Sequence, residues 1–289
     1  MTIAILGSAG QLGRDLLAQR EAVPLTRSDI DLSLPETIRP ALDRVRPTAL
    51  INCAAYNLVD RAESDSAAAF ATNAWGVREL AKACGERNIK LVHYSTDYVF
   101  GLLGDTGLSP LAEGAAPGPL SVYGLSKLAG EYAVRQYAPQ HLVIRTCGLY
   151  GVWGSGGKGT NFVETMLRVA SQGKPLRVVV DQHCTPSFTA DIAAATWQLL
   201  DTPANGLFHL TNAGATTWFE LAHAIFEKCD MPATLTPITT TEFGAAAARP
   251  PYSVLDCTKA AAFGVSLRPW PQALAAYLAV RASRGQDSR

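Results

Sequence analysis

The first half of the chain alternates short apolar runs with amphipathic stretches. Short apolar runs are typical of buried strands, and apolar residues every three or four positions are typical of helices that pack on them. The predicted strands are 2–6, 22–25, 49–54, 90–95 and 141–145, and the predicted helices are 10–19, 35–45, 66–87 and 120–137. Strands separated by helices of this length form βαβ units. The pattern therefore predicts an α/β fold with a Rossmann-like, doubly wound parallel sheet.

The pattern changes near residue 150. A glycine-rich stretch, 151–159, precedes a helix that we expect to begin near Asn161, and the later elements are short and interrupted by prolines. Two further helices are predicted at 218–229 and 271–280. We expect residues 1–150 to form an NAD(P)-binding domain. Residues 151–289 are expected to form mainly a smaller C-terminal substrate-binding region, with part of 176–215 returning to the sheet.

Composition and charge exclude several kinds of partner. The chain has 289 residues, and Lys plus Arg and Asp plus Glu both total 25, which gives a formal net charge of zero. A neutral chain has no general attraction to nucleic acid or to an anionic membrane. The N-terminus shows no signal peptide, and no apolar run reaches the about 18 residues of a spanning helix, so we expect a cytoplasmic protein. The six cysteines are scattered without a CxxC pair, which favours free thiols over a metal site.

Three glycines follow the first predicted strand. Gly7, Gly10 and Gly13 form GxxGxxG at the start of the first helix. Glycines allow the backbone to turn tightly and to approach a pyrophosphate, whose charge the unpaired N–H groups of a helix N-terminus stabilise. The spacing differs from the common GxGxxG, and the alternative is a strand-to-helix turn without a ligand. The position between strand and helix favours a dinucleotide site.

The residues after the second strand bear on the choice of cofactor. Arg27 is placed to contact the 2′-phosphate of NADPH, or else it is a solvated surface arginine. Acidic residues follow only at Asp29 and Asp31, and Asp31 and Leu32 are better placed to border the adenine. The sequence therefore leaves NADPH and NADH open.

A tyrosine and a lysine mark a candidate catalytic centre. Tyr123 and Lys127 are four residues apart on a predicted helix, which puts both on one face. A nearby ammonium stabilises a phenolate, and the alkoxide left by hydride transfer to a carbonyl needs a proton. Ser95 and Thr96 lie where strand 90–95 ends, the sheet edge at which doubly wound proteins bind ligands. An isolated YxxxK pair is more often a solvated helix face, but the order of these features indicates a carbonyl reductase.

A series of longer motifs covers nearly the whole chain. They are GSAGQLG, INCAAYNLVDRAE, YSTDYVF, VYGLSKLAGE, DQHCTPS, GLFHLTNAGATTWFELA and ARPPYSVLD. In these motifs the chain resembles the dTDP-4-dehydrorhamnose reductases, which belong to the extended short-chain dehydrogenase/reductase superfamily. The resemblance implies reduction of the 4-keto group of dTDP-4-dehydro-L-rhamnose by NADPH or NADH. It also implies a small nucleotide-sugar substrate, a monomer or homodimer and, as in some members, Mg²⁺.

The resemblance also implies roles for individual residues. Thr96, Tyr123 and Lys127 match the family's catalytic triad. Tyr123 would donate the proton, Lys127 would bind the nicotinamide ribose and lower the tyrosine pKa, and Thr96 would hold the carbonyl. Asn73 lies in the helix where related reductases carry an asparagine. The other positions that match cofactor contacts are Gly7, Gly10, Gln11, Leu12, Asp31, Leu32, Ala54, Ala55 and Tyr56.

The chain departs from the family at two positions. Asn57 stands where a threonine is common, and Gly148 stands where the family often has a tryptophan against the substrate sugar. Trp153 follows five residues later. It is interpreted either as a ring that covers the sugar or as a loop tryptophan that packs on the substrate-binding region.

Two residues are candidates for the substrate diphosphate. Asn161 opens a helix and offers N–H groups to an anion, and Arg249 offers a charge-assisted contact. The alternatives are an ordinary helix cap and a surface charge. At the level of function, the alternatives are a reductase or epimerase for another nucleotide-linked 4-keto-6-deoxy sugar, and a non-catalytic protein like the regulatory subunit of methionine adenosyltransferase.

Overall fold

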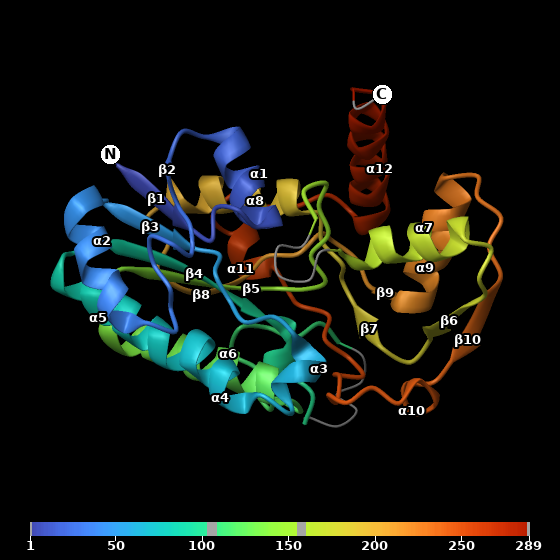
Figure 1. Cartoon of the computed structure of the whole chain (residues 1–289), viewed down its shortest axis with the longest axis horizontal. Coiled ribbons are helices and arrows are strands. Elements are labelled where there is room, and N and C mark those ends of the chain that lie inside the picture. The colour runs from blue at the N-terminus through green and yellow to red at the C-terminus, as the bar shows by residue number, and fades with distance from the viewer. Residues whose placement is uncertain (1, 103–108, 155–159, 288–289) are drawn as a thin grey trace.

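Six parallel strands form the central sheet of the computed structural model, which describes residues 2–102, 109–154 and 160–287 (Figure 1). Their order is β2-β1-β3-β4-β5-β8. The strands are β1 (Ile3–Leu6), β2 (Val23–Leu25), β3 (Ala49–Asn52), β4 (Lys90–Thr96), β5 (His141–Thr146) and β8 (Gly206–His209). The first five lie within two residues of their predicted bounds. The prediction of a doubly wound parallel sheet is confirmed.

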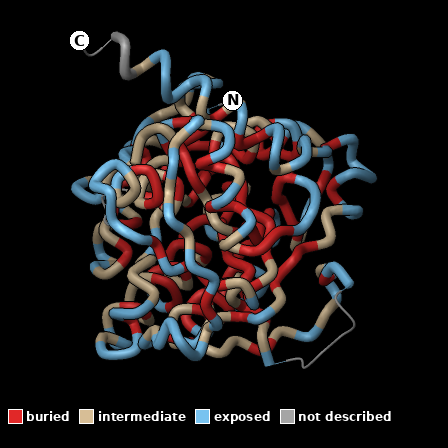
Figure 2. The backbone as a smooth tube through the Cα atoms, turned by 90° about the vertical axis from the view of Figure 1, so that its right-hand side faces the viewer, coloured by how far each residue is buried: buried red, intermediate tan, exposed pale blue. Residues whose placement is uncertain are grey.

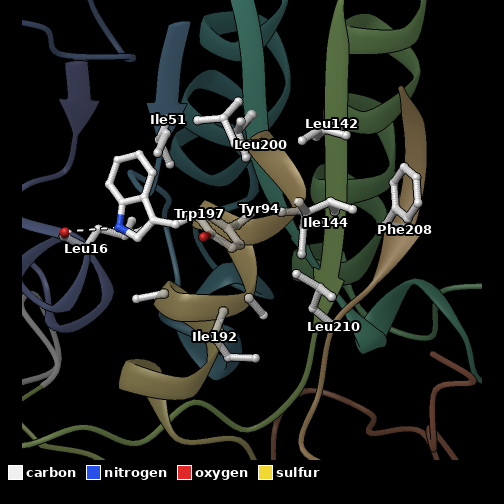
Figure 3. Packing of buried hydrophobic residues seen from close by; sticks show 14 of the residues in the cluster. Leu16, Ile51, Tyr94, Leu142, Ile144, Ile192, Trp197, Leu200, Phe208 and Leu210 are labelled. Carbon is white, nitrogen blue, oxygen red and sulfur yellow. Dashed lines mark hydrogen bonds between the residues drawn. The ribbon is translucent and has the colours of Figure 1, made fainter. Parts of the chain in front are cut away.

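Helices cover both faces of this sheet (Figure 1). One face carries α1 (Gln11–Gln19), α8 (Thr189–Leu200) and α11 (Thr258–Ala261), and the other carries α2 (Ile38–Val45), α5 (Val77–Glu86) and α6 (Val122–Tyr137). The short helix α4 (Ser66–Phe70) packs against α6. Successive strand residues point to opposite faces, so Ile5 packs below α1 and α8 whereas Ala4 packs against α2 and α5. Trp197 fills the first layer, and its indole N–H donates to the Leu16 carbonyl at 3.2 Å (Figure 3).

The helix predicted at 66–87 is interrupted by a π-helical turn, Ala71–Gly76. Gly76 lies so close to the loop after β2 that a Cβ there would be 2.0 Å from the Leu32 carbonyl oxygen. The turn also directs the Asn73 amide to the backbone of Tyr56, whose N–H and C=O it bonds at 2.9 Å each. The periodicity predicted the extent of the helix but not this turn, which tertiary contacts hold in place.

The C-terminal region builds a separate apolar cluster at the right of Figure 1. It contains α7 (Phe162–Ser171), α9 (Trp218–Lys228) and α12 (Trp270–Asp287), at the places where the periodicity predicts helices. Two small sheets were not predicted, one of β6 (Leu176–Val179) with β10 (Leu235–Ile238), the other of β7 (His183–Cys184) with β9 (Thr216–Thr217).

The remaining part of the C-terminal half lies on the main sheet, because β8, α8 and α11 all pack there. Two short helices are α3 (Val59–Ala62) and α10 (Thr240–Phe243), and Asp60 of α3 bonds residues 247 and 249 of the segment that follows α10. The end of α12 extends away from the body in the view of Figure 2 and passes the predicted helix end at residue 280. Residues 155–159 of the glycine-rich stretch lie outside the described residues. The described helices include none that is long and apolar enough to cross a bilayer.

Candidate active site

The loop between β1 and α1 is closed so tightly that only glycine fits. Gly7 has φ +78°, and a Cβ there would lie 2.7 Å from the amide nitrogen of Ala54. A Cβ on Gly13 would lie 2.5 Å from the Gly7 carbonyl oxygen. The Gly7–Ala54 contact joins the ends of β1 and β3, where the strand order reverses. Doubly wound sheets bind their ligands in the crevice at this switch point.

The first turn of α1 fits a dinucleotide pyrophosphate. Its N-cap, Gly10, has no side chain to satisfy the first N–H groups of the helix, which are therefore available to an anion. Gln11 donates from Nε2 to the Leu149 carbonyl at 3.2 Å, and its buried Oε1 has no partner among the described residues. Leu12 is 5% exposed and belongs to the core, so it can meet a ligand only through its backbone.

Two further segments border the same crevice. After β2, the exposed Arg27 bonds Asp31 from Nε to Oδ2 at 2.8 Å, whereas the Leu32 side chain is buried in the core. After β3, the backbone of Ala54 is held by Asn52, and Ala55 is exposed. The predicted cofactor residues thus lie along one edge of the sheet, although Leu32 offers only its backbone.

The three predicted catalytic residues meet at the carboxyl end of β4. Ser121 caps α6, its Oγ accepting from the Gly124 N–H at 3.1 Å, so that Tyr123 lies in the first turn. The Tyr123 hydroxyl is in hydrogen-bonding contact with Thr96, the last residue of β4. Lys127, one turn further along α6, donates from Nζ to the Tyr94 carbonyl at 2.6 Å. The fold therefore brings together residues from a strand end and a helix face.

Burial sets the protonation of this group. It raises the pKa of Tyr123 to about 12, although the hydrogen bond with Thr96 acts in the opposite direction. Burial lowers the pKa of Lys127 to about 8, and the Glu131 carboxylate opposes that change. Desolvation is the largest effect on the Tyr123 pKa, and the Lys127 ammonium is bonded to the Tyr94 carbonyl, so the lowering of the tyrosine pKa by Lys127 stays a prediction. A tyrosine in this state is a protonated acid at neutral pH.

Two residues that the sequence interpretation missed join the site. Asp97 is buried beside Thr96, which donates to its Oδ1 at 3.1 Å, and burial raises the pKa of this carboxyl. Ser253 donates to the other oxygen of Asp97 at 2.6 Å. Ser253 belongs to the ARPPYSVLD motif, so this late segment is tied to the end of β4. The sequence could have indicated both residues, because Asp97 lies in the motif YSTDYVF and Ser253 in ARPPYSVLD.

Ser95, the other predicted hydroxyl, has a different partner. Its Oγ donates to Glu131 Oε1 at 2.5 Å, inside the layer between β4 and α6. Thr96 therefore remains as the hydroxyl in contact with Tyr123.

Trp153 lies against α1 in this structure. Its indole N–H donates to Asp15 Oδ1 at 2.7 Å, and its ring centroid is 3.5 Å from the guanidinium carbon of Arg284 and 5.4 Å from that of Arg14. These contacts agree with the packing interpretation. A movement over the sugar would have to break all three of them.

Another aromatic ring adjoins Gly148. This glycine has φ +52°, and a Cβ there would lie 3.0 Å from the ring of Trp218. Trp218 begins α9 and packs on Phe162, with the ring centroids 4.7 Å apart. The tryptophan nearest to the position of the family's tryptophan is therefore Trp218, which the sequence interpretation did not consider.

The two candidates for the diphosphate already have structural partners. Asn161 caps α7, its Oδ1 accepting from the Glu164 N–H and its Nδ2 donating to the Gly151 carbonyl, both at 3.0 Å. Arg249 forms a two-pronged ion pair with Asp60, at 3.0 and 2.8 Å. These bonds agree with the alternatives of a helix cap and an ion pair, and a contact of Asn161 or Arg249 with the substrate diphosphate stays a prediction.

The described residues offer no evident metal site. Among residues 2–102, 109–154 and 160–287 no group of three or more His, Cys, Asp or Glu side chains is arranged to hold a metal ion. All six cysteines are free thiols.

A glycine loop at the switch point of a doubly wound sheet, beside a buried tyrosine and lysine, is typical of nicotinamide-dependent reductases. The chain is a nicotinamide-dependent oxidoreductase of the extended short-chain type. Residues 1–282 match the family model described as the RmlD substrate binding domain, and the chain belongs to this family.

Individual relatives carry related names. The chain is 39% identical over 292 residues to the dTDP-4-dehydrorhamnose reductase of Mycobacterium tuberculosis, covering 97% of this chain and 93% of the relative. It is 37% identical over 278 residues to a dTDP-4-keto-6-deoxy-D-glucose reductase of Streptomyces niveus, covering 93% and 94%. The crystal structure of dTDP-4-dehydrorhamnose reductase from Bacillus anthracis in complex with NADP matches with a TM-score of 0.90 and 34% identity, covering 96% of this chain and 99% of that one.

Proposed function

We propose that this chain reduces the 4-keto group of dTDP-4-dehydro-L-rhamnose with NADPH and so forms dTDP-L-rhamnose. The observation that carries the proposal is the Tyr123 hydroxyl, which burial keeps protonated and which contacts Thr96 at the end of β4. Membership of the RmlD family and the NADP-bound relative support the same reaction. Arg27, exposed just after β2, supports NADPH because a guanidinium there suits a 2′-phosphate.

Each residue has one task in the proposed reaction. The reduced nicotinamide, when bound, supplies the hydride for the carbonyl carbon. Tyr123 gives its phenolic proton to the carbonyl oxygen, so that the ketone becomes a secondary alcohol. Thr96 hydrogen-bonds the same oxygen and orients it. Lys127 binds the nicotinamide ribose, and its positive charge stabilises the phenolate that remains on Tyr123.

The cofactor would lie along the crevice that the glycine loop opens. Gly7, Gly10, Gln11 and the backbone of Leu12 would hold its pyrophosphate at the N-terminus of α1. Asp31 and the backbone of Leu32 would border the adenine. The segment Ala54–Tyr56 would line the middle of the cofactor. Asn52 and Asn73 hold this segment by accepting hydrogen bonds from the backbone N–H groups of Ala54 and Tyr56.

The sugar is the least constrained part of the proposal. The Streptomyces niveus relative, named for a 4-keto-6-deoxy-D-glucose substrate, is as similar to this chain as the rhamnose enzymes are. A reductase for another dTDP-linked 4-keto-6-deoxy sugar is therefore the second candidate. We also propose that the chain acts in the cytoplasm, since its named relatives are biosynthetic enzymes.

A substrate panel separates these candidates. The purified chain is incubated with NADPH and either dTDP-4-dehydro-L-rhamnose or dTDP-4-keto-6-deoxy-D-glucose, and loss of NADPH absorbance is followed. The product sugar is identified by NMR. We expect the higher kcat/KM with the rhamnose precursor. A higher kcat/KM with the glucose derivative would replace the proposed substrate, and no oxidation with any keto sugar would contradict the reductase function.

A further inference from the structure

A buried ion pair lies directly behind the candidate catalytic lysine. Glu131 of α6 and Arg145 of β5 are 1% and 3% exposed. They bond at two points, Nη2 to Oε2 at 2.7 Å and Nε to Oε1 at 2.9 Å. Ser95 of β4 adds a third bond to the carboxylate at 2.5 Å. The pair is thus held between α6, β5 and β4, and two of these elements, β4 and α6, also carry the candidate catalytic residues.

The carboxylate lies on the catalytic face of α6. Tyr123, Lys127 and Glu131 follow each other at intervals of four residues, so they form one row along the helix. The Glu131 carboxylate raises the pKa of Lys127, against the effect of burial. Its influence therefore reaches the lysine, although the ammonium itself is bonded to the Tyr94 carbonyl.

The other titratable groups around Lys127 are uncharged at neutral pH. Cys53, after β3, faces the ammonium, but burial raises the pKa of its thiol far above neutral. His93, on β4, also faces it, but burial lowers the pKa of the imidazole well below its usual value. Tyr123 is protonated. Among these described neighbours, Glu131 is the charged one.

Stability does not explain such a pair. Desolvation of two charges usually offsets their attraction, and apolar replacements of buried pairs are often neutral or more stable. An electrostatic role for the neighbouring site is a better explanation. We propose that Glu131 is a positioning residue for the reductase reaction. Its carboxylate, fixed by Arg145 and Ser95, keeps the Lys127 ammonium charged beside Tyr123, and Arg145 limits the strength of that field.

The proposal rests on the proposed function of Tyr123 and Lys127, and it predicts opposite effects for the two partners. Glu131→Gln leaves the Arg145 cation unpaired, and the added positive potential makes both catalytic groups lose their protons at lower pH. Arg145→Gln leaves the carboxylate unpaired, and the added negative potential moves the same losses to higher pH. Each shift should be about one pH unit, the usual size for a charge a few ångströms away. The double variant should return towards the wild type.

The experiment is the pH profile of kcat/KM for NADPH-dependent reduction, which reports groups of the free enzyme. The wild type, both single variants and the double variant are compared, with thermal unfolding to show that each is folded. Glu86→Gln is the matched control, because Glu86 lies on α5 in an exposed ion pair with Arg39. We expect the alkaline limb to move down in Glu131→Gln, up in Arg145→Gln and not at all in Glu86→Gln.

Several results would overturn the proposal. They are a wild-type profile in Glu131→Gln, shifts in the same direction in both single variants, or a double variant no closer to the wild type than Glu131→Gln. If Glu131→Gln does not fold, the direction of the shift in Arg145→Gln decides. The pH dependence of NADPH affinity, measured by fluorescence without the sugar, should shift in the same directions. This binding measurement separates a failure of the Glu131 proposal from a failure of the proposed function, because it tests the coupling of Glu131 to Lys127 even if no keto sugar is reduced.

Discussion

Two alanine substitutions in the glycine loop test the cofactor site in detail. In Gly13→Ala the new Cβ would lie 2.5 Å from the Gly7 carbonyl oxygen and 2.8 Å from the Ser8 Cα. Both are backbone atoms, so the loop and α1 must move apart. In Gly10→Ala the nearest atom, again the Gly7 carbonyl oxygen, would be 3.3 Å away, and the backbone has φ −76°, which any residue adopts.

The expected magnitudes follow from these distances. Overpacking of this kind costs about 1–3 kcal/mol, and each kcal/mol corresponds to about 2–4 °C of Tm in a chain of this size. Gly13→Ala should therefore lower Tm by several degrees. Its displaced loop should also lose charge-assisted bonds to the pyrophosphate worth about 1.5–3 kcal/mol, which is tenfold or more in Kd. Gly10→Ala should weaken NADPH binding with little change in Tm, because in the proposed binding mode its Cβ would lie at the helix N-terminus that holds the pyrophosphate.

The assay combines thermal unfolding without cofactor and NADPH titration by calorimetry. Gly85→Ala is the control, because a Cβ there would lie 2.2 Å from the Tyr137 carbonyl oxygen, at the contact of α5 with α6. It should lower Tm and leave the Kd for NADPH unchanged. A Gly10→Ala variant that binds NADPH as the wild type does would refute the position of the pyrophosphate. A Gly13→Ala variant with unchanged Tm would refute the packing argument.

Three further substitutions test separate parts of the account. Arg27→Ala should raise the Kd for NADPH tenfold or more and leave the Kd for NADH unchanged, since a charge-assisted bond is worth about 1.5–3 kcal/mol. An unchanged ratio of the two Kd values would exclude a contact of Arg27 with the 2′-phosphate. Burial lowers the pKa of His209 to about 3 in the folded protein, whereas a histidine in the unfolded chain has a pKa of about 6.5. As the pH falls from about 6.5 towards 3, the unfolded chain therefore takes up a proton at His209 that the folded protein does not, and the free energy of unfolding decreases. His209→Gln should flatten the slope of the unfolding free energy against pH, measured with urea, by up to about 1.4 kcal/mol per pH unit, and an unaltered slope would contradict this origin. Trp153→Phe should lower stability by about 1–3 kcal/mol, because the buried Asp15 loses a donor, without changing KM for the sugar; a raised KM would favour the sugar-covering role.

The sheet could be predicted because its strands are buried on both faces. In β1 both Ala4 and Ile5 are fully buried although they point in opposite directions, so the strand is a short apolar run. The edge pair of β6 and β10 gives no such signal, since β10 (Leu235–Ile238) has two exposed residues in the middle of its four. Short, partly exposed strands are specified by their partners and not by their own pattern.

The candidate site likewise has features that local sequence predicts and features that depend on distant contacts. The glycine loop and the Tyr123–Lys127 pair are local patterns, and the structure shows both on the elements that the sequence predicted. The partners of Asp97 and Arg249, in contrast, lie 156 and 189 residues away along the chain. No local pattern predicts that Arg249 pairs with the Asp60 carboxylate. Only the packing of the late segment on β4 and α3 determines it.

The central claim is that Tyr123 donates the proton to the keto sugar. Tyr123→Phe removes the hydroxyl and keeps the ring, and the decisive measurement is kcat for NADPH oxidation with dTDP-4-dehydro-L-rhamnose alongside the Kd for NADPH. The account predicts a fall in kcat of about 10²–10⁴-fold, the usual contribution of a general acid, with an unchanged Kd. A variant that turns over at the wild-type rate, or whose loss of rate follows entirely from a loss of NADPH affinity, would contradict it.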